Sequence, residues 1–188
     1  MVRGKITFIS GGVRSGKTAY AETLLEKSEC GRLVYVATGR PSDREMEERI
    51  RRHRQDRLDS PGNWETIERP LGLPGILPCF RKGDGVLIDC ITTWLANEMY
   101  EGADSGRPCL NRLGCMEKKI DALMDALADL SSVAAEVVVV SNEVLDEPPS
   151  EWTETRQYAE LLGGIHRRLV RLADRAIEMD AGIAHRWK

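Results

Sequence analysis

The segment Gly11-Gly12-Val13-Arg14-Ser15-Gly16-Lys17-Thr18 has the residue types and spacing that bind a nucleoside triphosphate. Its glycines let backbone N–H groups approach phosphate oxygens, and a helix starting there offers its positive end. Lys17 is placed to reach the β- and γ-phosphates, and the Thr18 hydroxyl is a ligand for Mg²⁺. The segment therefore predicts a P-loop. The alternative, a glycine-rich turn without a ligand, is disfavoured by the strand pattern before it and the helix pattern after it.

Asp89 is the second residue with a predicted role in metal binding. It ends the apolar run Val86-Leu87-Ile88-Asp89, where P-loop enzymes place the acid that holds the Mg²⁺ shell. We therefore expect Thr18 and Asp89 to bind the metal together, with Asp89 close to the nucleotide. The alternative is that Asp89 caps a helix over residues 91–97, because Asp is a favoured N-cap.

His53 lies in a highly charged segment that we expect to form a helix from Ser42 to about Leu58. Neighbouring guanidinium groups disfavour the imidazolium and leave a neutral nucleophile, so a covalent nucleotidyl-histidine is chemically reasonable. The alternative is a solvated basic helix with an incidental histidine. Five arginines surround His53: Arg49, Arg51, Arg52, Arg54 and Arg57.

Strand patterns alternate with helix patterns along the chain. Strands are expected at residues 5–10, 33–37, 64–67, 86–89, 137–142 and 175–183, and helices at 18–27, 42–58, 116–130 and 158–172. Residues 60–85 carry four prolines and predict a surface excursion. This order favours an α/β fold over residues 1–188, a single P-loop NTPase-type domain, RecA-like, with a mostly parallel central sheet flanked by helices.

Composition limits the classes of partner. A net charge of −3 and a pI near 5.7 give no general basic field for nucleic acid. No apolar run approaches the roughly 20 residues that span a bilayer, so we expect no stable membrane insertion and a cytoplasmic location. The five cysteines are scattered without C-x-x-C spacing, which indicates neither a disulfide framework nor a zinc site, and favours buried or idle thiols.

The chain resembles the family of bifunctional adenosylcobinamide kinase / adenosylcobinamide-phosphate guanylyltransferase enzymes of cobalamin biosynthesis. Matching blocks occur in the same order from residue 6 to residue 144, and the arginine-flanked histidine and the D-C-I-T-T-W block are the most specific. The blocks are Ile9-Ser10 with the P-loop, Tyr35-Val36-Ala37-Thr38, the residues 45–54 around His53, Trp64-Glu65-Thr66-Ile67-Glu68, Leu87 to Trp94 with Asn97, and Val140-Ser141-Asn142-Glu143-Val144.

The resemblance implies two successive reactions with ATP or GTP and Mg²⁺. The aminopropanol hydroxyl of adenosylcobinamide is phosphorylated, and GMP then passes from GTP through a histidine to the new phosphate, giving adenosylcobinamide-GDP. By this match His53 is the guanylylated residue, Lys17 is catalytic, and a homotrimer is implied. The match also implies nucleotide-binding roles for Ala37, Thr38, Gly39, Arg40, the residues Arg54 to Arg57, and Glu68.

Two departures from the family pattern leave other functions open. The family continues after Val144 with roughly G-x-G-I-V-P, whereas this chain has Leu145-Asp146-Glu147-Pro148-Pro149-Ser150, and His166 replaces a common asparagine. Loss of these glycines reshapes the corrinoid-facing loop or weakens one activity. One alternative is a P-loop small-molecule kinase without the guanylyltransferase step. Another is a nucleotide-dependent regulatory module. The chain lacks an N-K-x-D-like guanine-reading segment, which argues against this alternative.

Overall fold

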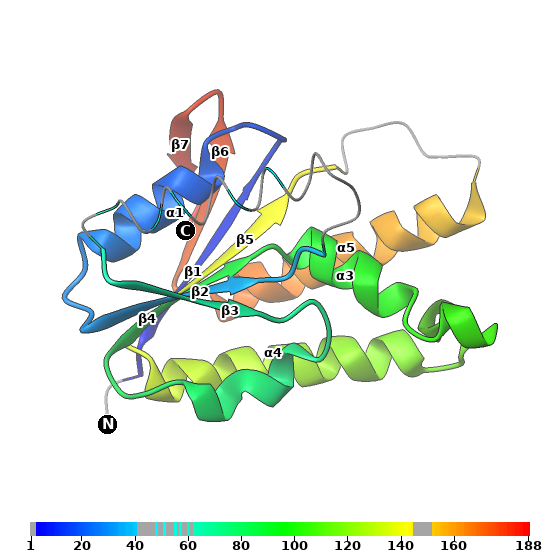
Figure 1. Cartoon of the computed structure of the whole chain (residues 1–188). Helices are drawn as coiled ribbons and strands as arrows, with labels where there is room; N and C mark the ends of the chain where they lie inside the picture. The colour runs from blue at the N-terminus through cyan, green and yellow to red at the C-terminus, as the bar shows by residue number, and fades with distance from the viewer. Residues whose placement is uncertain are drawn as a thin grey trace.

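Seven strands form one sheet in the described part of the chain, and all neighbours but one pair run parallel (Figure 1). The computed structural model describes residues 3–40, 48, 51, 55, 57, 60, 62–144 and 152–188. The sheet order is β3-β2-β4-β5-β1-β6-β7, and only β6 and β7 are antiparallel. The strands are β1 (Lys5–Gly11), β2 (Arg32–Ala37), β3 (Trp64–Glu68), β4 (Asp84–Asp89), β5 (Glu136–Asn142), β6 (Arg175–Asp180) and β7 (Ile183–Arg186).

Helices cover both faces of this sheet (Figure 1). On one face α1 (Lys17–Glu26) packs Ala21 and Leu25 against alternate residues of the central strands, including Val138 and Val140. On the other face α3 (Ile91–Met99), α4 (Cys115–Val133) and α5 (Thr153–Leu172) pack against the intervening residues, including Val137 and Val139. Burial on both faces explains why β5 is a continuous run of valines.

The predicted strands at 5–10, 33–37, 64–67, 86–89 and 137–142 and the helices at 18–27, 116–130 and 158–172 are confirmed to within five residues at their ends. The strand predicted at 175–183 is confirmed as β6 over Arg175–Asp180, but its continuation to 183 is wrong, because the chain reverses after Asp180 and pairs back on itself as β7. Ala181 and Gly182, both with positive φ, make the turn of this hairpin. The helix predicted over 42–58 lies largely outside the described residues.

The expectation of a surface excursion over residues 60–85 is only partly right. Trp64–Glu68 pairs with β2 as an edge strand, and a short 3₁₀ helix, η1 (Leu73–Cys79), buries Leu73 and Ile76 in the core. Pro74 stands in the first turn of η1, where a missing N–H costs no helical hydrogen bond. The prolines therefore shape a packed segment.

The cysteines differ from the sequence expectation at one place. A disulfide joins Cys109 and Cys115, whose Cα atoms lie 5.6 Å apart, while Cys30, Cys79 and Cys90 are free thiols. The short helices η2 (Ala103–Ser105) and η3 (Cys109–Asn111) turn the chain before α4 begins and bring the two cysteines together. The prediction of idle thiols is thus wrong for this pair.

In the described ranges, no helix is long and apolar enough to cross a bilayer.

Candidate active site

The P-loop joins the end of β1 to the start of α1, as predicted. Gly16 takes a left-handed conformation (φ 86°) as the N-cap of α1. A Cβ on Gly11 would stand 2.4 Å from the carbonyl oxygen of Met179, so this position requires glycine. The carbonyl of Gly11 accepts the N–H of Glu143 (2.8 Å), and the carbonyl of Ser15 accepts the N–H of Gly182 (3.1 Å). The end of β5 and the β6–β7 turn therefore hold the loop.

Lys17 is folded back over this loop. Its side chain is buried, and its Nζ donates a hydrogen bond to the carbonyl oxygen of Gly12 at 2.8 Å. The ammonium thus lies beside the backbone groups that cradle phosphates in a P-loop. The role in phosphate binding expected for Lys17 stays a prediction.

Asp89 lies beside Thr18 and Tyr35 at the carboxyl end of β4. Its Oδ2 accepts hydrogen bonds from the hydroxyls of Thr18 (3.0 Å) and Tyr35 (2.8 Å). The helix-cap interpretation of Asp89 is wrong, because the N-cap of α3 is Cys90 and no side chain caps that helix. Burial, together with the Asp89 charge, raises the pKa of Tyr35 well above its usual value, so Tyr35 stays a donor.

The Thr18–Asp89 pair fits a magnesium ion. Mg²⁺ in nucleotide enzymes takes one or two protein oxygen ligands and completes its shell with phosphates and water. A hydroxyl and a carboxylate oxygen 3.0 Å apart provide such a donor set next to the P-loop. The described ranges contain no group of three His, Cys, Asp or Glu side chains able to hold a metal without such help.

Arg57 is buried over Tyr35, whose hydroxyl donates to Asp89, and has 5% of its surface exposed. Its guanidinium carbon lies 3.6 Å from the centroid of the Tyr35 ring, and its Nη1 lies 3.6 Å from Oε1 of Glu22. Within the part of the chain that the structure describes, the Nε and Nη1 atoms of Arg57 have no hydrogen-bond partner. Burial raises the pKa of Glu22 to about 7 even though the charge of Arg57 lowers it. The residues Glu22 and Tyr35 were not predicted as site residues.

A hydrogen-bonded junction joins the ends of β2 and β4. The Thr38 hydroxyl donates to the carbonyl of Cys90 (2.8 Å) and accepts the Cys90 N–H (2.9 Å). Asn97 Nδ2 donates to the carbonyl of Thr38 (2.8 Å). Two sequence blocks that lie far apart in the chain, around Ala37 and around Asp89, are thereby brought together.

A second polar group lies on the α5 side of the P-loop. His166 Nε2 is 2.8 Å from the Ser141 hydroxyl, and its Nδ1 is 3.9 Å from Oε2 of Glu143. Burial lowers the pKa of His166 to about 4, so the ring is neutral at neutral pH and the contact with Glu143 is no ion pair. Sequence reasoning singled out His166 only as a departure from a family pattern.

The predicted site residues thus divide into three sets. Residues 11–18, Asp89 and Arg57 meet at the carboxyl edge of the sheet, together with the ends of β2 and β3 that carry Ala37, Thr38 and Glu68. Thr38 is fully buried and Glu68 is exposed, while Gly39 and Arg40 follow β2 without a described contact to the P-loop. His53 and Arg54 lie outside the described residues.

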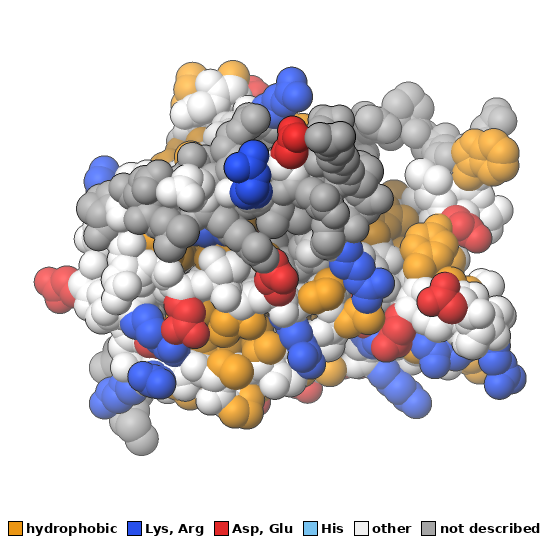
Figure 2. All heavy atoms as spheres, viewed as in Figure 1, with side chains coloured by type: hydrophobic (Ala, Val, Ile, Leu, Met, Phe, Trp, Pro, Cys, Tyr) orange, Lys and Arg blue, Asp and Glu red, His pale blue; other side chains and the backbone are white. Residues whose placement is uncertain are grey.

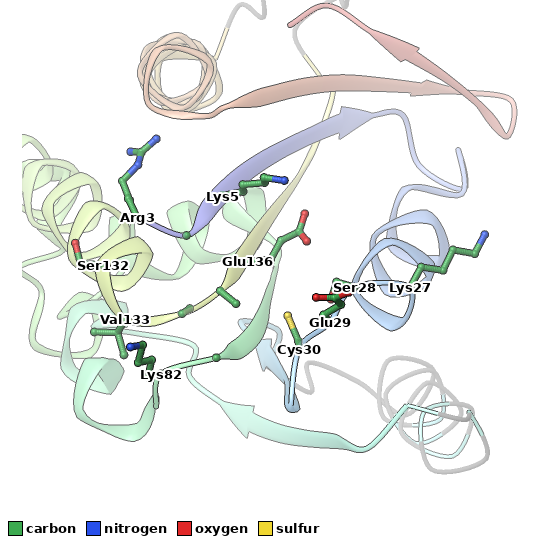
Figure 3. A pocket seen from close by; sticks show the side chains of 14 residues that line it. Arg3, Lys5, Lys27, Ser28, Glu29, Cys30, Lys82, Ser132, Val133 and Glu136 are labelled. Carbon is green, nitrogen blue, oxygen red and sulfur yellow. The ribbon is translucent and has the colours of Figure 1, made fainter. Parts of the chain in front are cut away.

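The opposite edge of the sheet carries a hollow of about 880 Å³ (Figure 3). It lies at the amino ends of β1, β4 and β5, and its basic lining residues are Arg3, Lys5, Lys27 and Lys82. None of the predicted site residues lines it.

On the face seen in Figure 2, positively and negatively charged side chains are interspersed.

The sequence matches the model of one protein family over residues 7–187, described as cobinamide kinase / cobinamide phosphate guanyltransferase. Two similar proteins are both named bifunctional adenosylcobalamin biosynthesis protein CobU. The one from Escherichia coli (strain K12) is 31% identical over 182 residues, 96% of this chain and 98% of that protein. The one from Salmonella typhimurium (strain LT2) is 30% identical over the same shares. These matches confirm the resemblance inferred from the sequence.

Similar solved structures show the fold. A prototypical ATPase from the type III secretion system of pathogenic bacteria superposes with a TM-score of 0.59 and 15% identity, over 98% of this chain and 57% of that chain. The assembled ATPase EscN of enteropathogenic E. coli gives a TM-score of 0.52 and 17% identity, over 95% of this chain and 43% of that chain. The predicted P-loop NTPase-type, RecA-like α/β fold is confirmed.

Proposed function

This chain belongs to the cobinamide kinase / cobinamide phosphate guanyltransferase family, and we propose that it makes adenosylcobinamide-GDP in two steps. It first phosphorylates adenosylcobinamide with ATP or GTP. It then transfers GMP from GTP to the new phosphate through guanylyl-His53. The observation that carries the proposal is the P-loop with Lys17 over its backbone and the Thr18–Asp89 pair beside it.

In the kinase step, an oxygen of the acceptor hydroxyl bonds to the γ-phosphorus as the bond to the β-phosphate oxygen breaks. Nucleoside diphosphate leaves, and the hydroxyl proton passes to solvent or to a nearby base. Lys17 neutralises charge on the transferred group, which is most of what such a reaction needs from the protein. Thr18 and Asp89 would hold Mg²⁺, which supplies further neutralisation of the phosphate oxygens.

In the guanylyltransferase step, a ring nitrogen of His53 bonds to the α-phosphorus of GTP and pyrophosphate leaves. A phosphate oxygen of the first product then attacks the same phosphorus and frees the histidine. Arg57 supports this assignment, because it lies over Tyr35, which donates to Asp89, and follows His53 by four residues. Four residues span at most about 14 Å when fully extended.

The alternative of a kinase without guanylyltransferase activity is favoured by one observation, the replacement of the family's glycine-containing segment by residues 145–150. Product analysis separates the proposals. With adenosylcobinamide, GTP and Mg²⁺, we expect the GDP ester and pyrophosphate. A phosphate ester with nucleoside diphosphate alone would establish the kinase, and the absence of corrinoid product would favour a regulatory module.

The family resemblance also leads us to propose a homotrimer. Light scattering on the purified chain tests this proposal, and a monomeric mass would reject it.

A further inference from the structure

We propose that Glu22 and Tyr35 are positioning residues that hold Arg57 in the P-loop site, and that guanylyl transfer depends on them more strongly than phosphoryl transfer. The inference rests on the proposed function, because it concerns how the two reactions of one site differ in their needs. Neither residue belongs to the P-loop or to the predicted metal pair. Both contact Arg57, and Tyr35 also donates a hydrogen bond to Asp89.

The geometry places Arg57 between these two side chains. The face of the Tyr35 ring lies under the guanidinium carbon at 3.6 Å, a cation–π contact, and Glu22 lies 3.6 Å from Nη1. Arg57 and Tyr35 are 5% and 8% exposed. Such burial makes the aromatic contact stronger than it would be on the surface and limits the rotamers open to Arg57.

The charges explain why a carboxylate is needed at position 22. A guanidinium this deeply buried is costly unless a negative group lies near it. Among the described residues, the charged groups that act on Glu22 are Arg57, Asp89 and Glu26, and Arg57 is the positive one. Asp89 accepts hydrogen bonds from Thr18 and Tyr35, so Glu22 is the carboxylate that pairs with Arg57.

One further donor of Arg57 points to its use. With Nη1 facing Glu22, the buried Nε has no hydrogen-bond acceptor among the described residues, and buried polar groups in native proteins are normally satisfied. A guanidinium held over Tyr35, whose hydroxyl donates to Asp89, matches the oxygens of a phosphate. An Arg57 fixed by Glu22 and Tyr35 would therefore reach a phosphate oxygen without first having to be ordered.

The effect on the two reactions differs because of where Arg57 stands in the chain. It follows His53 by four residues, whereas the kinase step relies on residues 11–18 and Asp89. Arg57 is thus close in sequence to the proposed nucleophile and lies outside the P-loop, so its displacement is expected to affect the guanylyl step first. Misplacing a reacting group by about 1 Å costs up to about 100-fold in rate.

The experiment compares Glu22→Gln with Glu26→Gln in both half-reactions. Glu26 lies one turn further along α1 and accepts a hydrogen bond from Trp64 Nε1 (3.0 Å), so its change is chemically matched and away from Arg57. Retained label from GTP labelled at the α-phosphate measures the guanylyl step, and corrinoid phosphate formed with ATP measures the kinase step. We expect Glu22→Gln to slow guanylylation about 10- to 100-fold and phosphorylation by less than about threefold, with Glu26→Gln near wild type in both.

A pair of Tyr35 variants gives an independent readout. Tyr35→Phe keeps the ring under Arg57 and loses only the hydroxyl, so it should affect the two steps alike. Tyr35→Leu removes the ring as well as the hydroxyl, so it should slow guanylylation beyond the effect of Tyr35→Phe while slowing phosphoryl transfer no more than Tyr35→Phe does. Retained phosphoryl transfer shows in each case that the variant is folded.

Equal guanylylation in Glu22→Gln and wild type would overturn the inference, and so would an equal loss of both steps in Glu22→Gln and Tyr35→Leu. Failure of the wild type itself to retain label is a different result. It would remove the proposed guanylyl-histidine, and with it the inference that depends on it.

Discussion

At the scale of single residues, the site is organised by one carboxylate. Asp89 Oδ2 accepts two hydroxyl hydrogen bonds, one from the P-loop and one from β2. Because both donors converge on the same oxygen, Asp89 connects the predicted metal pair to Tyr35, and Tyr35 connects it to Arg57. A change at Asp89 should therefore reach both proposed reactions.

Asp89→Asn tests this connection. The amide keeps the shape and removes the charge, so we expect both half-reactions to slow about 100-fold, a typical cost of removing one electrostatic stabiliser, and the Mg²⁺ concentration for half-maximal rate to rise. Asp121→Asn on the exposed side of α4 is the matched control. A rate unaffected by Asp89→Asn at all Mg²⁺ concentrations would refute the metal role.

His166 predicts a dependence of stability on pH. Its pKa is lowered by burial to about 4 in the folded chain, against about 6.5 when unfolded. The unfolded chain therefore binds more protons in this window, and stability present above pH 6.5 is lost as the pH falls toward 4. Between pH 7 and pH 5 the loss is about 2 kcal/mol.

His166→Asn should remove this contribution, which urea unfolding at pH 7 and pH 5 measures. Glu22, whose pKa is raised to about 7, acts in the opposite direction, but equally in both proteins. His185→Asn, at an exposed position of β7, is the control and should keep the wild-type difference. An unchanged difference in His166→Asn would exclude the buried histidine as its source.

At the scale of elements, the P-loop is held by two neighbours, the end of β5 and the β6–β7 turn. The second contact includes the hydrogen bond from the N–H of Gly182 to the carbonyl of Ser15. The hairpin therefore influences the conformation of the P-loop at Ser15. Its geometry depends on the positive φ of Gly182.

Gly182→Ala should weaken nucleotide binding. The substitution strains a left-handed position by about 1–2 kcal/mol. Relief of part of that strain displaces the N–H of residue 182, which donates to the carbonyl oxygen of Ser15. We expect the Kd for GTP to rise about fivefold. Gly106→Ala, at φ 70° and with equal open space around its Cβ, should lose similar stability and bind GTP normally. Equal Kd values in the two variants would contradict the role of the hairpin.

The elements also show what the sequence could predict. Strands and helices with strong periodicity, the P-loop between β1 and α1, and Asp89 at the end of β4 follow from local pattern alone. The pairing of Cys109 with Cys115 and the position of Arg57 over Tyr35 depend on turns and on contacts between distant segments. The single strand expected over 175–183 missed the hairpin, whose turn has positive φ at Ala181 and Gly182.

Glu22 shows the same limit within one helix. It lies one turn after Thr18, a spacing that places both side chains on the same face of α1. That spacing predicts that Glu22 lies near the P-loop, but it does not identify the residue with which Glu22 pairs. Only the packing of β2 and of Arg57 against α1 turns an ordinary helical glutamate into the carboxylate beside a buried guanidinium.

At the scale of the whole molecule, the two edges of the sheet, formed by the carboxyl and the amino ends of its parallel strands, carry different groups of residues. The carboxyl edge gathers the P-loop, the metal pair and Arg57, as expected for open α/β sheets, whereas the amino edge carries the hollow lined by lysines (Figure 3). Both proposed reactions are thereby assigned to one edge. A single triphosphate site would then serve attack at the γ-phosphate in one step and at the α-phosphate in the other.

The most direct test of this account is incubation of the wild-type chain and His53→Ala with Mg²⁺ and GTP labelled at the α-phosphate. We predict that the wild type retains label, that His53→Ala does not, and that adenosylcobinamide phosphate discharges the label as the GDP ester. A wild-type chain without label, or equal labelling of His53→Ala, would contradict the proposed guanylyl-histidine.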